Sequence, residues 1–338
     1  LIEKIEETHF IGKELYKLFK LYYFSEVDYS SKTLKQAVLA YLMKIADKAI
    51  EPNKIYPEEF RTKEKKTIFF NNITQRVQVV KKEQFDIYKA KLDEKARIDG
   101  TFREEIDKKI YDQRGFEAEM FQRETQERVE IYEWNDETRK DFKRNVILGD
   151  PGLGKSSLLN FEANKLANEA IQILQNAKDT PEETAKVLRN IKIPINLRIA
   201  DIAGEATKSK ELVLTIAELA SFDEKVNDER KSLELYLKET ICKQQNAVLL
   251  FDALDEVPEG TEKGLTRREI ADKISNFAKE YQENSILLTS RKVNYERVNL
   301  HSAKQNSLSD DNLEILPFDE TQIKNYVAGW FCKDSQTT

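Results

Sequence analysis

A glycine-rich segment at residues 149–157 constrains the fold more than any other feature of the sequence. It fits the pattern G-x-x-x-x-G-K-[ST] without a mismatch and reads Gly149, Asp150, Pro151, Gly152, Leu153, Gly154, Lys155, Ser156 and Ser157. Glycines permit a backbone with positive φ and leave no Cβ between the main chain and a bound group. Lying between an apolar run and a helical pattern, the segment predicts a strand, a phosphate-binding loop and a helix.

We expect this loop to hold the phosphates of a nucleotide, either ATP or ADP, with Mg²⁺. The N–H groups of the loop and of the helix that begins near Lys155 would point inward at the positive helix end. Lys155 can bring a charge to the β- and γ-phosphates, and the Ser156 hydroxyl can ligate Mg²⁺. The alternative is a glycine-rich turn that merely precedes a helix.

An acidic segment follows the apolar run at residues 247–251. Asp252 ends this run, and we expect it to bind Mg²⁺ through water, because carboxylates suit this hard ion. If Asp255 ended the strand instead, Asp252 would be an unpaired charge inside it, at considerable cost. Asp255 and Glu256 can orient or deprotonate the attacking water. For each of the three acids the alternative is a solvated acidic turn.

A third polar strand end is expected at Arg291, which follows the apolar run at residues 286–288 and two polar residues. A cation at this place can contact the γ-phosphate and detect its loss. The alternative is an ordinary surface ion pair.

The distribution of apolar residues predicts an α/β fold, with a parallel sheet between helices in three layers. Short runs rich in Ile, Leu and Val alternate with amphipathic stretches, as in βαβ units, and occupy residues 146–148, 191–199, 247–251, 286–288 and 313–316. We place a domain boundary near Trp134. It separates a mainly α-helical region, 1–133, of unknown role from a nucleotide-binding domain, 134–338.

Region 1–133 shows helical periodicity in two stretches, residues 15–22 and 34–45, the second preceded by the capping candidates Ser30 and Ser31. Residues 67–70 and 77–80 form a β-like run that the sequence does not place. The mixed charges of residues 81–144 indicate exposed helix faces or, alternatively, a partner-binding surface.

Composition argues against several other classes of function. A formal net charge of −6 disfavours broad binding to nucleic acid. The apolar run at 247–251 is far shorter than the roughly 18 residues that cross a bilayer, and residues 1–10 do not resemble a secretory signal. With two cysteines, Cys242 and Cys332, and two histidines, His9 and His301, a zinc site or a Ser/His/Asp hydrolase is not expected. So few cysteines fit a reducing cytoplasm.

Three segments together resemble the NACHT domain of the STAND class of P-loop NTPases: residues 146–159, 249–257 and 287–291. The most distinctive feature is small Ala253 directly after Asp252, followed by the pair Asp255 and Glu256. ABC ATPases instead place Glu directly after the metal-binding Asp and carry an LSGGQ-like segment, which is absent here. Residues 193–198 and 315–331 also resemble the family, so the resemblance covers about residues 134–331.

The resemblance implies a molecular switch. Such proteins rest with ADP, exchange it for ATP when a sensor region binds its trigger, and then oligomerise so that an attached effector acts. Bacterial members take part in antiviral defence, which implies a protein or phage-derived trigger, and animal relatives are innate-immune receptors. The sequence ends soon after Trp330, before the family's winged helix and repeats, so we expect it to lack its sensor.

We therefore expect slow hydrolysis of ATP by in-line attack of water. GTP is disfavoured, because the Asn-Lys-x-Asp type of guanine-reading motif is missing. The segment that comes nearest to it, Asn164, Lys165, Leu166 and Ala167, lacks the acid and lies on the helix after the glycine loop. One rival function is an AAA+-like motor acting on nucleic acid or protein, with Arg267 or Arg268 as an arginine finger. Another is a scaffold that the nucleotide merely stabilises.

Overall fold

The computed structural model describes residues 27–50, 77–81, 84–85, 87–90, 129–221, 227–260, 264–298 and 312–324. Several sequence-based expectations lie outside these residues: those for His9, His301, Cys332, residues 15–22, residues 67–70 and the segment around Trp330. Among the described helices, none combines the length and the apolar character needed to cross a membrane.

The centre of the structure is a seven-stranded sheet with the order β2-β1-β7-β3-β6-β5-β4. Neighbouring strands from β7 to β4 run parallel, whereas β1 is antiparallel to both β2 and β7. The strands are β1 (Gln78–Lys81), β2 (Ile131–Glu133), β3 (Arg144–Leu148), β4 (Ile193–Arg198), β5 (Ala247–Asp252), β6 (Ser285–Ser290) and β7 (Leu313–Ile315). The five apolar runs predicted to be strands are thereby confirmed.

Two short strands complete the sheet beside β7. The unplaced run at residues 77–80 forms most of β1, which joins β7 to β2. Because β1 and β2 both precede Trp134, the sheet contains strands from the N-terminal side of the expected domain boundary. The division of the chain near Trp134 stays a prediction.

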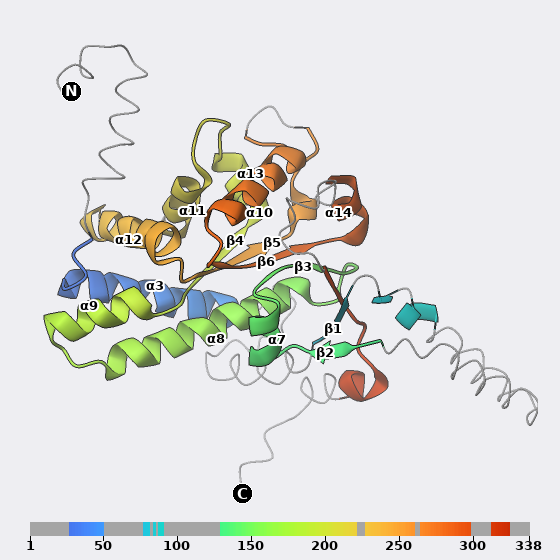
Figure 1. The fold of residues 1–338 in the computed structure, drawn as a ribbon, viewed down its shortest axis with the longest axis horizontal. Helices are drawn as coiled ribbons and strands as arrows, with labels where there is room; N and C mark the ends of the chain where they lie inside the picture. Colours follow the sequence, from blue (N-terminus) through green and yellow to red (C-terminus); the bar gives the residue numbers. More distant parts are fainter. Residues whose placement is uncertain are drawn as a thin grey trace, which may run out of the picture.

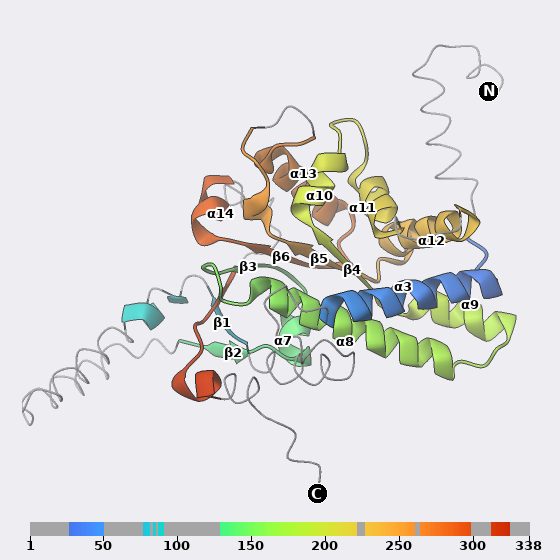
Figure 2. The ribbon, with the colours of Figure 1, turned by 180° about the vertical axis from the view of Figure 1, so that it is seen from behind.

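Helices cover both faces of the sheet, which confirms the three-layer α/β fold (Figures 1 and 2). One face carries α10 (Ile199–Glu205), α11 (Leu212–Ser221), α13 (Arg267–Glu280) and α14 (Lys292–Val298). The other carries α3 (Lys32–Ile50), α7 (Asp136–Asp141), α8 (Lys155–Asn176) and α9 (Pro181–Asn190). Helix α12 (Asn227–Glu239) and a π-helical turn (Thr240–Gln244) lead into β5.

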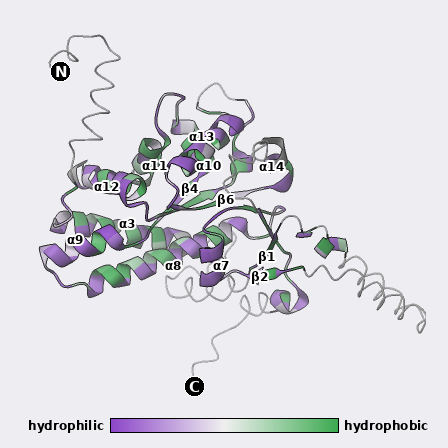
Figure 3. Cartoon of the chain, in the orientation of Figure 1, coloured by the Kyte–Doolittle hydropathy of each residue, from purple (hydrophilic) through white to green (hydrophobic). Residues whose placement is uncertain are grey.

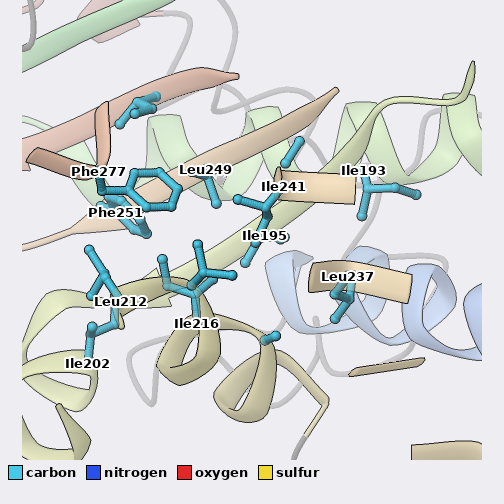
Figure 4. Close-up of a cluster of buried hydrophobic side chains, with 14 of the residues drawn as sticks. Ile193, Ile195, Ile202, Leu212, Ile216, Leu237, Ile241, Leu249, Phe251 and Phe277 are labelled. Carbon is cyan, nitrogen blue, oxygen red and sulfur yellow. The ribbon is translucent and has the colours of Figure 1, made fainter. Parts of the chain in front are cut away.

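The parallel strands are buried on both faces, so successive residues belong to two different hydrophobic clusters. In β5, Leu249 and Phe251 face one cluster, and Val248 and Leu250 face the other. Figure 4 shows the first cluster, in which β4 and β5 side chains meet those of α10 and α11. The helices carry both hydrophobic and hydrophilic residues (Figure 3), as is typical of helices that pack against a sheet.

Helix α3 packs beside α8 in the same layer and also contacts the sheet. Ser31 caps it as predicted, its Oγ accepting a hydrogen bond from Leu34 N at 3.4 Å. The predicted apolar face is buried, and the Tyr41 hydroxyl donates to the carbonyl oxygen of Pro194 in β4 at 2.9 Å. From α8, Asn164 Nδ2 donates to the Ala46 carbonyl oxygen at 3.0 Å. Helix α3 is therefore held by the sheet and by the helix that follows the glycine loop.

Replacing Leu42 by Ala should test this packing. Leu42 is 0% exposed, so the Leu42→Ala variant should lose about 2–5 kcal/mol of unfolding free energy, measured by urea denaturation. Met43 on the same helix is 45% exposed, and Met43→Ala should change that free energy by less than about 0.5 kcal/mol. Equal effects of the two substitutions would mean that α3 does not belong to the folded core.

Candidate functional site

The parallel arrangement brings the predicted polar strand ends to one edge of the sheet. Leu148 at the end of β3 is in register with Ser290 at the end of β6. Asp252 at the end of β5 is in register with Arg198 at the end of β4. The glycine loop, Arg291 and the acidic turn follow three of these ends, so the candidate site residues come together at a single edge.

The glycine loop joins β3 to α8 in the conformation that its sequence requires. Gly152 and Gly154 have φ of +85° and +84°. These values lie in the left-handed region, which residues other than glycine rarely adopt. A Cβ added to either glycine would meet no heavy atom within 4 Å, so the space beside them is open. Helix α8 begins at Lys155, and Leu158 N donates to the Gly154 carbonyl oxygen at 2.8 Å. An open space beside these glycines at a helix N-terminus fits a phosphate group.

Lys155 lies over this loop. Its Nζ donates to the carbonyl oxygens of Gly149 at 2.7 Å and Asp150 at 3.0 Å. Burial lowers the pKa of Lys155, while the charges of Asp255 and Asp252 act in the opposite direction. Ser156 and Ser157, in the first turn of α8, are exposed. Lys155 is thus a partly desolvated cation within electrostatic reach of the acidic turn.

Asp252 ends strand β5, as predicted, and Thr289 of β6 holds its side chain. Thr289 Oγ1 donates to Asp252 Oδ1 at 2.6 Å and accepts from Ala253 N at 2.9 Å. Ala253 has φ +59° and ψ +63°, a left-handed conformation that costs roughly 1–2 kcal/mol in a residue with a Cβ. Thr289 is fully buried and stabilises both this turn and the direction of the carboxylate. Sequence analysis assigned Thr289 no role.

Asp255 forms an ion pair with Arg291. Arg291 Nε lies 2.9 Å from Asp255 Oδ2, and the Arg291 backbone N donates to Asp255 Oδ1 at 3.1 Å. The Asp255 side chain is only 6% exposed, whereas that of Arg291 is 51% exposed. Both carboxylate oxygens of Asp255 are therefore engaged in holding Arg291.

Arg267 stabilises the acidic turn from the other side. It is buried at the start of α13, where Nε donates to the Val257 carbonyl oxygen and Nη2 to the Asp255 carbonyl oxygen, both at 2.9 Å. Nη1 also contacts Glu259 Oε1 at 3.2 Å. Its neighbour Arg268 is exposed. These contacts occupy Arg267 within its own chain and argue against its role as an arginine finger.

Glu256, the last of the predicted acids, pairs with Arg198. Arg198 Nη2 lies 2.5 Å from Glu256 Oε2, with the two side chains 60% and 47% exposed. The hydrogen bond from Arg198 to Glu256 and the carboxylate charge raise the pKa of the guanidinium. Arg198 was assigned no role from the sequence, although a charged residue near the end of the predicted apolar run 191–199 was a usable signal.

The metal-binding potential of the site depends on the nucleotide. Among the described residues, no group of three or more His, Cys, Asp and Glu side chains is arranged to hold a metal ion by itself. Nucleotide-bound Mg²⁺ needs no such cage, because one or two protein ligands, the phosphates and water complete its shell. Asp252, oriented by Thr289, and the exposed Ser156 hydroxyl fit this second kind of site.

Removing Arg267 should separate a structural from an intersubunit role. Arg267→Ala should lower the unfolding free energy by about 1–3 kcal/mol, because the carbonyl oxygens of Asp255 and Val257 lose their donor. The control Arg268→Ala should change it by less than about 0.5 kcal/mol. Both are measured by urea denaturation. If Arg267→Ala is as stable as the parent protein but loses hydrolysis at the protein concentrations at which the parent assembles, Arg267 is instead an arginine finger.

Comparison with known proteins agrees with this geometry. Residues 208–334 match the family model of the NACHT domain, and a comparison with curated proteins finds no match. The matched segment includes the acidic turn, Arg267 and Arg291, and its strand β6 lies between β5 and β3, the strand that leads into the glycine loop. The match of this segment, together with the fold, is consistent with a NACHT-type nucleoside-triphosphatase domain of the P-loop class.

Proposed function

We propose that the chain binds Mg·ATP at this edge of the sheet, hydrolyses it slowly and acts as a nucleotide-dependent signalling switch. The observation that supports this most strongly is the meeting of opposite charges beside an open glycine loop. The charges of Asp255, Arg291 and Asp252, which lie at the ends of the neighbouring strands β5 and β6, all act on Lys155. Such convergence of cations and carboxylates beside a helix N-terminus suits a triphosphate with its metal ion.

Phosphate binding would exchange the partners of Lys155. Its ammonium group now donates to two loop carbonyl oxygens, and we propose that β- and γ-phosphate oxygens replace them. The N-terminus of α8 adds the partial positive charge of a long helix. Gly149, Asp150, Pro151, Gly152, Leu153, Gly154, Lys155, Ser156 and Ser157 form the proposed phosphate-binding segment.

Asp252 and Ser156 would hold Mg²⁺, which when bound neutralises charge on the β- and γ-phosphates. The contribution of the protein is orientation: Thr289 directs one carboxylate oxygen of Asp252 through a 2.6 Å hydrogen bond. Arg291, kept in place by Asp255, would contact the γ-phosphate and detect its loss.

Of the two acids proposed to act on water, Glu256 suits the role better than Asp255. Both oxygens of Asp255 are engaged by Arg291, and its side chain is nearly buried. Glu256 is half exposed and has one oxygen in contact with Arg198. We propose that Glu256 orients the attacking water and accepts its proton, whereas Asp255 positions Arg291.

The contacts of the segment at Asn164 and Lys165 support ATP over GTP. Asn164 donates to the Ala46 carbonyl oxygen at 3.0 Å, and Lys165 contacts Asp136 at 2.5 Å. These side chains attach α3 and α7 to the flank of α8, where they are engaged in packing the helices together. The one resemblance to a guanine-reading segment therefore has a structural explanation.

The family match supports a switch, and its finer features are part of the proposal. We propose that ATP binding promotes self-oligomerisation, that region 1–133 carries the effector or its connection, and that the protein works in the cytoplasm in antiviral defence. The trigger would be a protein or phage-derived molecule. Retained ADP with slow release would support the switch over its rivals, since rapid multiple turnover would indicate a motor and undetectable hydrolysis a scaffold.

Replacing Lys155 tests the phosphate-binding loop. Lys155→Ala should weaken binding of ATP, measured by calorimetric titration, by roughly tenfold to a hundredfold, because a hydrogen-bonded charge contact is worth about 1.5–3 kcal/mol. The control Lys165→Ala removes a lysine from the same helix and should leave ATP affinity unchanged. Equal affinity of Lys155→Ala and the parent protein would show that the loop does not bind phosphate.

Replacing Asp252 tests the metal assignment. Asp252→Asn should bind ATP without metal as the parent does, but the Mg²⁺ concentration that supports tight binding should rise roughly tenfold to a hundredfold. Titrations of ATP at a series of Mg²⁺ concentrations measure this. An identical Mg²⁺ dependence of the two proteins would exclude Asp252 from the metal site.

A further inference from the structure

The ion pair between Arg198 and Glu256 lies at the same strand edge as the proposed metal-binding carboxylate. Arg198 is the last residue of β4, and its Cα is in register with that of Asp252 in β5. Glu256 belongs to the 3₁₀ turn Leu254–Glu256 that follows β5. Arg198 therefore contacts the turn from a neighbouring strand rather than from within the turn.

The backbone on both sides of Glu256 is fixed. Arg267 donates to the carbonyl oxygens of Asp255 and Val257, the residues that flank Glu256. Asp255 is also held through its side chain by Arg291. Because the main chain of the turn is constrained in this way, the direction of the Glu256 carboxylate depends on its own side-chain torsions and on the contact with Arg198.

The contact is strong enough to bias Glu256 and weak enough to be released. Its N–O distance is 2.5 Å, but both side chains are about half exposed, and ion pairs in such positions are readily screened. An unpaired Glu256 side chain would therefore be more mobile.

We propose that Arg198 is a positioning residue that restrains Glu256 and thereby keeps hydrolysis slow, an inference that rests on the proposed role of Glu256. In the restrained state the carboxylate is turned toward β4. When Glu256 leaves Arg198, it can accept a proton from water as the water oxygen bonds to the γ-phosphorus. The bond from that phosphorus to the β–γ bridging oxygen then breaks, ADP leaves with the electron pair, and inorganic phosphate is formed.

The test is single-turnover hydrolysis of saturating Mg·ATP by the whole chain and its variants. Arg198→Ala should hydrolyse ATP about two- to fivefold faster than the parent, with ATP affinity unchanged. This range corresponds to the free energy that an exposed ion pair contributes. Arg198→Lys, which keeps the charge, should stay near the parent rate. The control Lys143→Ala breaks a similarly exposed ion pair to Glu283, before the start of β3, and should not change the rate.

Ionic strength provides a second readout that a purely structural role would not change. The parent rate should rise with added KCl, because salt screens the pair, whereas the rate of Arg198→Ala should not. If Arg198→Ala lowers the unfolding midpoint, Arg198→Gln, which retains most of the side-chain length, is judged by the same criteria.

Glu256→Gln separates failure of this inference from failure of the proposed function. A large loss of rate in Glu256→Gln, together with acceleration in Arg198→Ala, supports both. If Glu256→Gln loses most of the rate but Arg198→Ala hydrolyses ATP no faster than the parent, only the proposed restraint by Arg198 is wrong. If Glu256→Gln hydrolyses ATP at the parent rate, Glu256 does not act on water, and both its proposed role and the restraint are wrong.

Discussion

The parallel pairing of β4, β5, β6 and β3 is the constraint on which the rest of the structure depends. These strands are buried on both faces, so they tolerate charge only where they end. Parallel register places all four ends at one edge, where they present the glycine loop, two arginines and the acidic turn. The chemistry of the site follows from the way in which the apolar core is built.

Further side-chain contacts fix each polar group at this edge in a different environment. Thr289 binds Asp252 and the strained Ala253 turn, Arg291 engages Asp255, and Arg267 holds the backbone that follows. Pairing of this kind is what makes partly buried charges tolerable. It also makes neighbouring acids unequal, because Asp255 is fixed and nearly buried while Glu256 remains half exposed.

Local pattern was sufficient to predict some of these features. The glycine loop and the end of β5 at Asp252 depend on residues adjacent in sequence, and both lie where they were expected. Thr289 and Arg198 were not identified because each acquires its partner through the pairing of strands: Thr289 and Asp252 are 37 positions apart in the sequence, and Arg198 and Glu256 are 58 positions apart. Likewise, periodicity predicted helix α3, but its docking on α8 depends on tertiary contacts such as that of Asn164.

The most direct test of the account is a crystal structure with Mg²⁺ and a non-hydrolysable ATP analogue. We predict triphosphate density within the loop that precedes α8, with Lys155 turned from the loop carbonyl oxygens to the phosphates and the metal ion between Ser156 and Asp252. Nucleotide bound elsewhere, or phosphates in the loop with a metal ion remote from Asp252, would contradict it.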